Sequence, residues 1–165
     1  CELKIKMVSS FILYKLNYFL HFFSKPYVAS YLEIADFIST YGTNVDENLH
    51  QLWRRIIFNI AISNTDDHLR NHGFILKEKG WKLSPAYDIN PSIEKEGLSL
   101  NIDMDSNELD YDLAFSVGKY FRLNKSEMET IKEEVISAVK LWKETAGKIG
   151  ISRSEIDLLE AAFYV

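Results

Sequence analysis

Three side chains with oxygen donors stand near one another in the middle of this sequence. Asp66 and Asn71 are five residues apart, and Asp88 follows after an apolar interval. Phosphoryl transfer needs such a set, because one carboxylate must accept a hydroxyl proton while a second carboxylate and an amide oxygen hold Mg²⁺ against the phosphates. The residue types and their spacing therefore point to phosphoryl transfer as the chemistry to test against the rest of the chain.

A buried helix must lead into this polar region. Residues 46–63 carry a wide apolar stripe, which predicts a helix in the core. All but one of residues 63–71 are polar, so the helix should give way to a loop there. Residues 74–76 read as a short strand, and a second strand follows with Trp81 and Leu83. The sequence thus predicts a β-hairpin between Asn71 and Asp88.

Other helices have readable ends. A Ser-x-x-Glu capping box begins at Ser30 and another at Ser152, and each predicts the start of a helix. A further helix is expected from Asn124 or Ser126 to about residue 148. We therefore expect a mainly α fold with one short hairpin.

The amino-acid composition excludes several classes of function and site. The 165 residues include 19 Lys and Arg against 24 Asp and Glu, so the net charge is −5. This balance argues against a broad basic face for nucleic acid. The single cysteine excludes an internal disulfide and a multi-cysteine zinc site, and it fits a reducing compartment such as the cytoplasm.

The first 27 residues differ from the rest. Residues 7–23 are strongly apolar, but Lys15 and Asn17 lie in the middle of the run. Both are costly at a bilayer centre, and the run is shorter than the roughly 20 residues of a spanning helix. We expect residues 7–23 to form a buried helix or a partner-facing apolar surface, with a membrane-associated or artefactual segment as the alternative. The expected segments of the chain are 1–27 and a domain over 28–165.

Two stretches carry a resemblance to a known family. RRIIFNIAISNTDDHLRNHGFIL and WKLSPAYDINPS resemble the catalytic core of the HipA family of bacterial serine/threonine kinase toxins. The family pattern is close to N-x-D-D/G-H-x-K/R-N, then a hairpin, then L-S/T-P-x-Y-D. The resemblance covers about residues 28–163. It implies a helical kinase-like C-lobe, with the hairpin between the catalytic loop and a metal-binding Asp.

The resemblance also implies roles, cofactors and partners. ATP and Mg²⁺ would be the cofactors, and a protein serine, such as one on an aminoacyl-tRNA synthetase, would accept the γ-phosphate. A HipB-like antitoxin would be a partner, and DNA contact would arise only through it. The implied roles are catalytic base for Asp66, Mg²⁺ ligands for Asn71 and Asp88, the phosphate side of the nucleotide site for His68, Leu69 and Arg70, and a place beside Asp88 for Tyr87.

The sequence departs from a complete family member at its start. Such a member has an N-terminal lobe with a phosphate-covering loop and a lysine for the nucleotide, whereas residues 1–27 contain no glycine. The chain thus resembles the C-lobe alone. We expect it to be inactive or nearly so by itself, with a separate N-terminal lobe as a further partner.

Other functions fit parts of the pattern. A non-catalytic toxin remnant could bind an antitoxin or a separate N-lobe through the apolar segment. A metal-dependent phosphohydrolase could use Asp66, Asp67, His68 and Asp88. The paired carboxylates could merely cap a turn, and His68 and His72 have the spacing of a zinc pair on a helix.

Three polar residues of the predicted core helix have open roles. Arg54 and Arg55 could be solvated or salt-bridged, or one of them could be buried and hold a carboxylate of the polar loop. Asn59 interrupts an apolar face and is expected to tie down that loop by hydrogen bonds.

Overall fold

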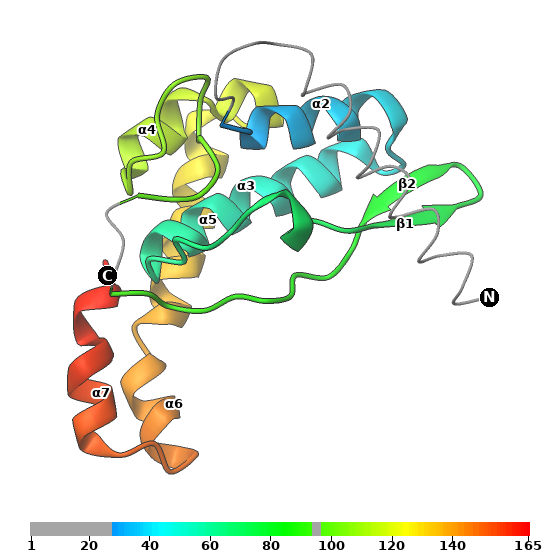
Figure 1. The fold of residues 1–165 in the computed structure, drawn as a ribbon. Coiled ribbons are helices and arrows are strands. Elements are labelled where there is room, and N and C mark those ends of the chain that lie inside the picture. The colour runs from blue at the N-terminus through cyan, green and yellow to red at the C-terminus, as the bar shows by residue number, and fades with distance from the viewer. Residues whose placement is uncertain (1–27, 94–96) are drawn as a thin grey trace.

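The structure is a computed structural model, and it describes residues 28–93 and 97–165. The apolar segment 7–23 and the expected boundary at residue 28 lie outside or at the edge of this range, so both stay predictions. The described chain is mainly helical and contains one antiparallel sheet of two strands (Figure 1). The expected class, a helical lobe with a short hairpin, is confirmed.

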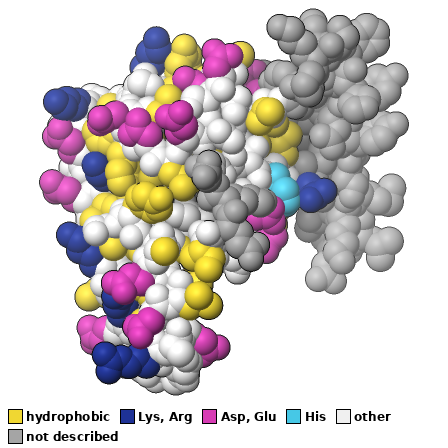
Figure 2. Space-filling model, turned by 60° about the vertical axis from the view of Figure 1, so that its left-hand side comes forward, with side chains coloured by type: hydrophobic (Ala, Val, Ile, Leu, Met, Phe, Trp, Pro, Cys, Tyr) yellow, Lys and Arg dark blue, Asp and Glu magenta, His cyan; other side chains and the backbone are white. Residues whose placement is uncertain are grey.

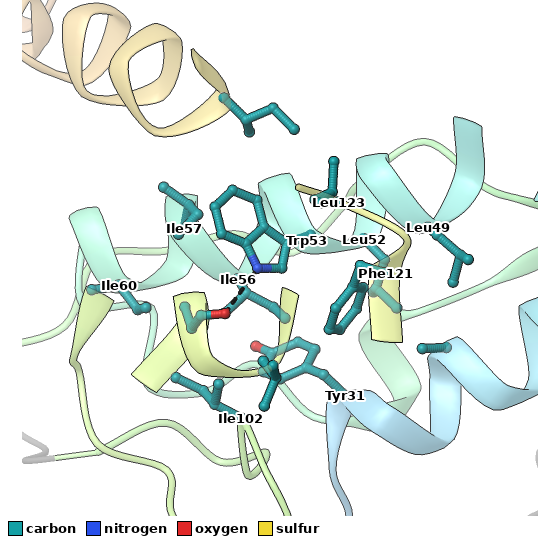
Figure 3. Close-up of a cluster of buried hydrophobic side chains, with 14 of the residues drawn as sticks. Tyr31, Leu49, Leu52, Trp53, Ile56, Ile57, Ile60, Ile102, Phe121 and Leu123 are labelled. Atoms are coloured by element: carbon teal, nitrogen blue, oxygen red, sulfur yellow. Dashed lines mark hydrogen bonds between the residues drawn. The ribbon is translucent and has the colours of Figure 1, made fainter. Parts of the chain in front are cut away.

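Helix α3, Val45–Ala61, is the centre of the molecule. Its stripe is buried, and it packs against α2, Tyr31–Tyr41, and α5, Lys125–Val139. The indole of Trp53 is fully buried in this core, and its Nε1 donates to the carbonyl oxygen of Ala114 at 3.0 Å (Figure 3). Because α3 packs against several elements, the place where it ends, at Ala61, and the direction of the following loop are fixed.

The predicted caps form as expected. Ser30, Asn124 and Ser152 each begin a helix with a capping box, in which the Glu three residues later bonds back to the cap. These bonds satisfy backbone N–H groups that a helix start leaves unpaired. The remaining helices are α4 (Tyr111–Ser116), α6 (Trp142–Lys148) and α7 (Arg153–Leu159), with 3₁₀ turns at Leu69–Asn71, Gly118–Phe121 and Glu160–Ala162.

The helix expected to reach residue 148 is in fact two helices, so that expectation is wrong. Helix α5 ends at Val139 and α6 begins at Trp142. Between them, Leu141 N–H bonds to the carbonyl of Ala138 in a tighter turn. This turn lets the Trp142 ring stack on Phe163, with centroids 3.9 Å apart, so α6 pairs with the C-terminal segment rather than with α3 (Figure 1).

The hairpin consists of β1, Phe74–Lys77, and β2, Gly80–Leu83, paired as Phe74 with Leu83 and Lys77 with Gly80. Gly80 has φ +137°, and a side chain there would meet the carbonyl oxygen of Tyr41 at 2.8 Å. A glycine is thus required where the hairpin turn crosses the end of α2.

The face shown in Figure 2 mixes acidic and basic side chains with hydrophobic ones. Over this face there is no continuous basic area of the kind that nucleic-acid binding requires. None of the helices in residues 28–93 and 97–165 is long and apolar enough to cross a membrane.

Candidate functional site

Two adjacent aspartates follow α3 and point into opposite environments. The side chain of Asp66 is 69% exposed, whereas that of Asp67 is 5% exposed. The helix ends just before them, where Ile62 leaves helical geometry and Ser63 takes a left-handed φ of 49°. The turn thereby sends one carboxylate to the surface and the next into the core.

The buried carboxylate is held from three sides. Asp67 Oδ2 accepts hydrogen bonds from the Tyr31 hydroxyl at 2.6 Å and from Asn59 Nδ2 at 2.6 Å. His72 Nε2 lies 3.0 Å from the same oxygen. Asn59 also accepts a bond from Asn64 Nδ2 at 3.0 Å, so it ties down the loop as the sequence suggested.

Burial and charge perturb the groups around Asp67. The pKa of Tyr31 is raised well above its usual 10.0, first by burial and then by the negative charge of Asp67. Burial also lowers the pKa of Arg55, and the nearby Asp67 carboxylate partly offsets that effect.

Arg55 connects the loop to the chain after the hairpin. The residue is 9% exposed, and its NH2 group donates to the carbonyl oxygen of Ser84. Arg54 forms an ion pair with Glu134, whereas Arg55 is the buried arginine, and its hydrogen bond goes to a backbone carbonyl. One guanidinium thus contacts the segment that leads to Asp88 and lies in the field of Asp67.

Asn71, a predicted Mg²⁺ ligand, lies between the predicted base Asp66 and the other predicted ligand, Asp88. It ends the 3₁₀ turn Leu69–Asn71 and is 5% exposed. Its Nδ2 lies 3.4 Å from the backbone oxygen of Asp66 and 3.4 Å from that of Asp88. The fold therefore brings Asp66, Asn71 and Asp88 together although the hairpin separates them in sequence.

Asp88 is exposed and has a left-handed φ of 55°. Its Oδ1 accepts a bond from Asn90 Nδ2 at 3.3 Å. Beyond it the chain runs back beside the polar loop, where Ser92 N–H donates to the Ser63 carbonyl at 3.1 Å. These contacts keep the segment around Asp88 against the loop that carries Asp66.

Among the residues predicted to face a nucleotide, His68, Arg70 and Tyr87 make polar contacts near Asp66, whereas Leu69 packs toward the core. His68 Nε2 lies 3.0 Å from Arg70 NH2 and 4.0 Å from Asp66 Oδ2, so these side chains cluster. Tyr87 is 46% exposed, and its hydroxyl donates to the Arg70 carbonyl at 2.7 Å. Burial raises the pKa of Tyr87 above its usual 10.0. Leu69, by contrast, packs partly buried against the core.

The side-chain oxygens of Asn71 and Asp88 suit a hard cation, such as Mg²⁺, that keeps several of its water ligands. In residues 28–93 and 97–165 no three His, Cys, Asp or Glu side chains gather at a metal-binding distance. The His68 and His72 spacing therefore builds no zinc centre there. Mg²⁺ needs less, since one or two protein oxygens plus phosphate and water oxygens complete its shell. Both carbonyl contacts of Asn71 use its amide nitrogen, so its amide oxygen remains the atom suited to a cation.

A cavity of about 540 Å³ lies nearby, between α3, α5 and the segment after β2. Arg55, Ser84 and Ile89 are among its lining residues. Asp66, Asn71 and Asp88 do not line it, so it is separate from the cluster described above.

Sequence reasoning missed two partners of the buried carboxylate, Tyr31 and His72. Tyr31 lies 36 positions before Asp67 on another helix, and it reads as one more apolar residue of that helix. His72 is five residues after Asp67. A histidine so near an aspartate in a polar loop was a usable signal for this contact.

Comparison with known proteins identifies the domain. The family described as the HipA-like C-terminal domain matches residues 4–142, a range that also includes the apolar segment 7–23. A protein of Haemophilus influenzae named "Putative kinase" is 42% identical over 60 residues, which cover 36% of this chain and 18% of that protein. The aligned part is thus under a fifth of that relative. Because the family match spans most of the sequence and includes Asp66, Asn71 and Asp88, the chain belongs to the HipA family through its C-terminal domain.

Proposed function

We propose that this domain supplies the catalytic loop and the metal ligands of a HipA-like serine/threonine protein kinase. In this proposal the γ-phosphate of ATP passes to a protein serine. The residues involved are Asp66 in the loop after α3, Asn71 at the end of the 3₁₀ turn, and Asp88 after the hairpin.

One observation supports the proposal most strongly. The side-chain amide of Asn71 bridges the backbones of Asp66 and Asp88, at 3.4 Å from each carbonyl oxygen. Protein kinases require a base, an amide ligand and a carboxylate ligand at one place, because phosphoryl transfer depends on positioning and on neutralised charge. The alternative in which the two aspartates only cap a turn does not account for a bridge to Asp88.

Each side chain then has a role that its surroundings permit. The exposed Asp66 carboxylate orients the serine hydroxyl and accepts its proton. Asn71 and Asp88 would hold Mg²⁺, and bound Mg·ATP supplies the phosphoryl group and neutralises its charge. Arg70 is suited to phosphate oxygens because a guanidinium presents several donors in one plane.

The other assigned residues support that arrangement. His68 lies between Asp66 and Arg70 and can orient both. Tyr87 holds the backbone of Arg70 through its hydroxyl. Leu69 packs on the core, so its proposed part is to fix the 3₁₀ turn rather than to contact phosphate through polar atoms.

The proposal extends to partners and place of action. A HipB-like antitoxin, a separate N-terminal lobe and a protein substrate such as an aminoacyl-tRNA synthetase are the proposed partners, and the cytoplasm is the proposed location. DNA would be reached only through the antitoxin. We also propose that the chain alone has little or no turnover, since the residues assigned here do not include a clamp over the ATP phosphates.

A phosphotransfer assay tests this function. The purified chain is incubated with Mg²⁺, γ-labelled ATP and a serine-containing protein, with and without a HipA-family N-terminal lobe added as a second polypeptide. We expect labelling to require that lobe and to be lost in Asp66→Ala. The exposed Asp36→Ala on α2 is the matched control and should keep wild-type labelling.

Three results would count against parts of the proposal. Labelling that persists in Asp66→Ala would remove the base assignment. Robust turnover by the chain alone would refute its inactivity, and phosphate release from a simple ester without ATP would favour the phosphohydrolase alternative.

A further inference from the structure

A single buried oxygen collects donors from three parts of the fold. Asp67 Oδ2 receives the Tyr31 hydroxyl from α2, the Asn59 amide from α3, and His72 from the loop beyond the 3₁₀ turn. The side chain of Asp67 is 5% exposed, and the residue directly follows the proposed base, Asp66. One peptide bond therefore joins the anchored residue to the proposed base.

The contacts fix the tautomer of His72. A carboxylate can only accept, so the proton between His72 and Asp67 resides on Nε2. His72 Nδ1 is buried and has no hydrogen-bond partner among residues 28–93 and 97–165. A proton on Nδ1 would be a buried donor without an acceptor among these residues, so the Nε2–H tautomer fits the hydrogen bond to Asp67. The ring also packs edge-on against Tyr31, at a centroid distance of 5.7 Å.

Arg55 is a buried cation whose charge interacts with that of Asp67: burial lowers the pKa of Arg55, and the Asp67 carboxylate raises it. The same guanidinium donates to the Ser84 carbonyl, four residues before Asp88. Asp67 is therefore connected on one side to the loop of Asp66 and on the other, through Arg55, to the segment of Asp88.

We propose that Asp67 is a positioning residue for phosphoryl transfer, which acts through His72 and Arg55 to hold Asp66, Asn71 and Asp88 in one arrangement. The inference rests on the proposed kinase function and adds a residue that does not itself touch substrate. A buried carboxylate with several charge-assisted bonds is a costly way to stabilise a fold, because each charge loses its hydration. Its benefit is a single fixed geometry for the exposed residues beside it.

The test compares Asp67→Asn with wild type by two measurements. The first is ¹⁵N NMR of the histidine rings, in which wild type should show His72 as the Nε2–H tautomer. The second is the affinity for Mn²⁺·ATP, measured by paramagnetic resonance with Mn²⁺ as the probe for Mg²⁺. We expect Asp67→Asn to lose the fixed tautomer and to bind Mn²⁺·ATP at least about tenfold more weakly, as loss of such a supporting partner does at metal sites.

A matched control separates positioning from general destabilisation. Ile57→Val removes one methylene from the core at a fully buried site. It should lower the melting temperature and change Mn²⁺·ATP affinity less than about twofold, since Ile57 makes none of the hydrogen bonds to Asp67. Tyr31→Phe removes one of the three donors and should weaken binding by less than Asp67→Asn does.

The outcomes distinguish this inference from the proposed function. If Asp67→Asn loses the His72 signature but binds Mn²⁺·ATP like wild type, the positioning role is refuted and the kinase proposal stands. If Ile57→Val weakens binding as much as Asp67→Asn, the role is also refuted. If wild type binds no Mn²⁺·ATP even with an added N-terminal lobe, the proposed function fails and the inference fails with it.

Discussion

Asp66 and Asp67 are the same residue type at neighbouring positions, yet one is exposed and the other is buried under three hydrogen bonds. The sequence predicts that this loop carries the chemistry, because its residue types match phosphoryl transfer, and the roles of its side chains stay a prediction. It could not predict which carboxylate faces water. That choice depends on the left-handed turn at Ser63 and on Tyr31, a side chain of another helix.

The alkaline limit of stability should report on Tyr31. Its pKa is raised in the folded state by burial and by Asp67, whereas in the unfolded chain it titrates near 10. Above that pH the unfolded chain loses the proton and the folded chain keeps it, so the free energy of unfolding falls as pH rises. We expect Tyr31→Phe to show a shallower fall than wild type above pH 10 in urea unfolding.

The comparison needs a correction for other tyrosines. Burial raises the pKa of Tyr111 to about 12, so Tyr111→Phe should flatten the same limb by its own share. Identical slopes for wild type and Tyr31→Phe would contradict the buried hydroxyl contact with Asp67.

At the scale of elements, the sequence predicts the start of a helix reliably where a capping box marks it. The capping boxes at Ser30 and Ser152 each begin a helix at the expected residue. The break between α5 and α6 carried no such signal, because neither Lys140 nor Leu141 opposes a helix. The break follows from the stacking of Trp142 on Phe163, which is a tertiary contact.

Gly73 directly precedes strand β1, and an alanine there tests how closely the hairpin must pack against Tyr87. A Cβ at Gly73 would lie 3.1 Å from Ser84 Oγ and 3.3 Å from the Tyr87 hydroxyl. Gly73→Ala should therefore push Tyr87 from the Arg70 carbonyl and weaken Mn²⁺·ATP binding several-fold, with a modest change in melting temperature.

Gly147→Ala is the matched control for that substitution. Nothing lies within 4 Å of a Cβ at Gly147 in α6, so alanine should stabilise the chain by up to about 1 kcal/mol and leave binding unchanged. Equal binding by both alanine variants would show that Tyr87 does not need this close packing.

At the scale of the molecule, α3 serves both the core and the site. Its buried stripe packs against α2 and α5, and its last residue, Ala61, accepts a bond from Tyr164 N–H at 2.8 Å. Ser63 Oγ also donates to the Ala162 carbonyl at 2.8 Å. The C-terminal segment thus supports the turn that leads to Asp66. No local pattern predicts such a contact, because it joins residues nearly 100 positions apart.

The shared helix makes global stability sensitive to its stripe. Ile56 is fully buried, so Ile56→Ala should lower the free energy of unfolding by about 2–5 kcal/mol. Ile149 is 72% exposed, and Ile149→Ala should change it by less than about 0.5 kcal/mol. Chemical denaturation measures both, and similar losses in the two variants would contradict the burial of α3.

The central claim is that Asn71 and Asp88 bind one cation beside Asp66. A double-mutant cycle tests it most directly, with Mn²⁺·ATP affinity measured by paramagnetic resonance for wild type, Asn71→Ala, Asp88→Asn and the double variant, each with an N-terminal lobe present. Asp157→Asn on α7 is the control, and it should bind like wild type.

Residues that share a ligand have non-additive effects. We predict that each single substitution weakens Mn²⁺·ATP binding at least about tenfold. The double variant should bind Mn²⁺·ATP only slightly more weakly than the single variant with the lower affinity. Fully additive losses, or wild-type affinity in Asp88→Asn, would show that the two side chains do not hold a common ion.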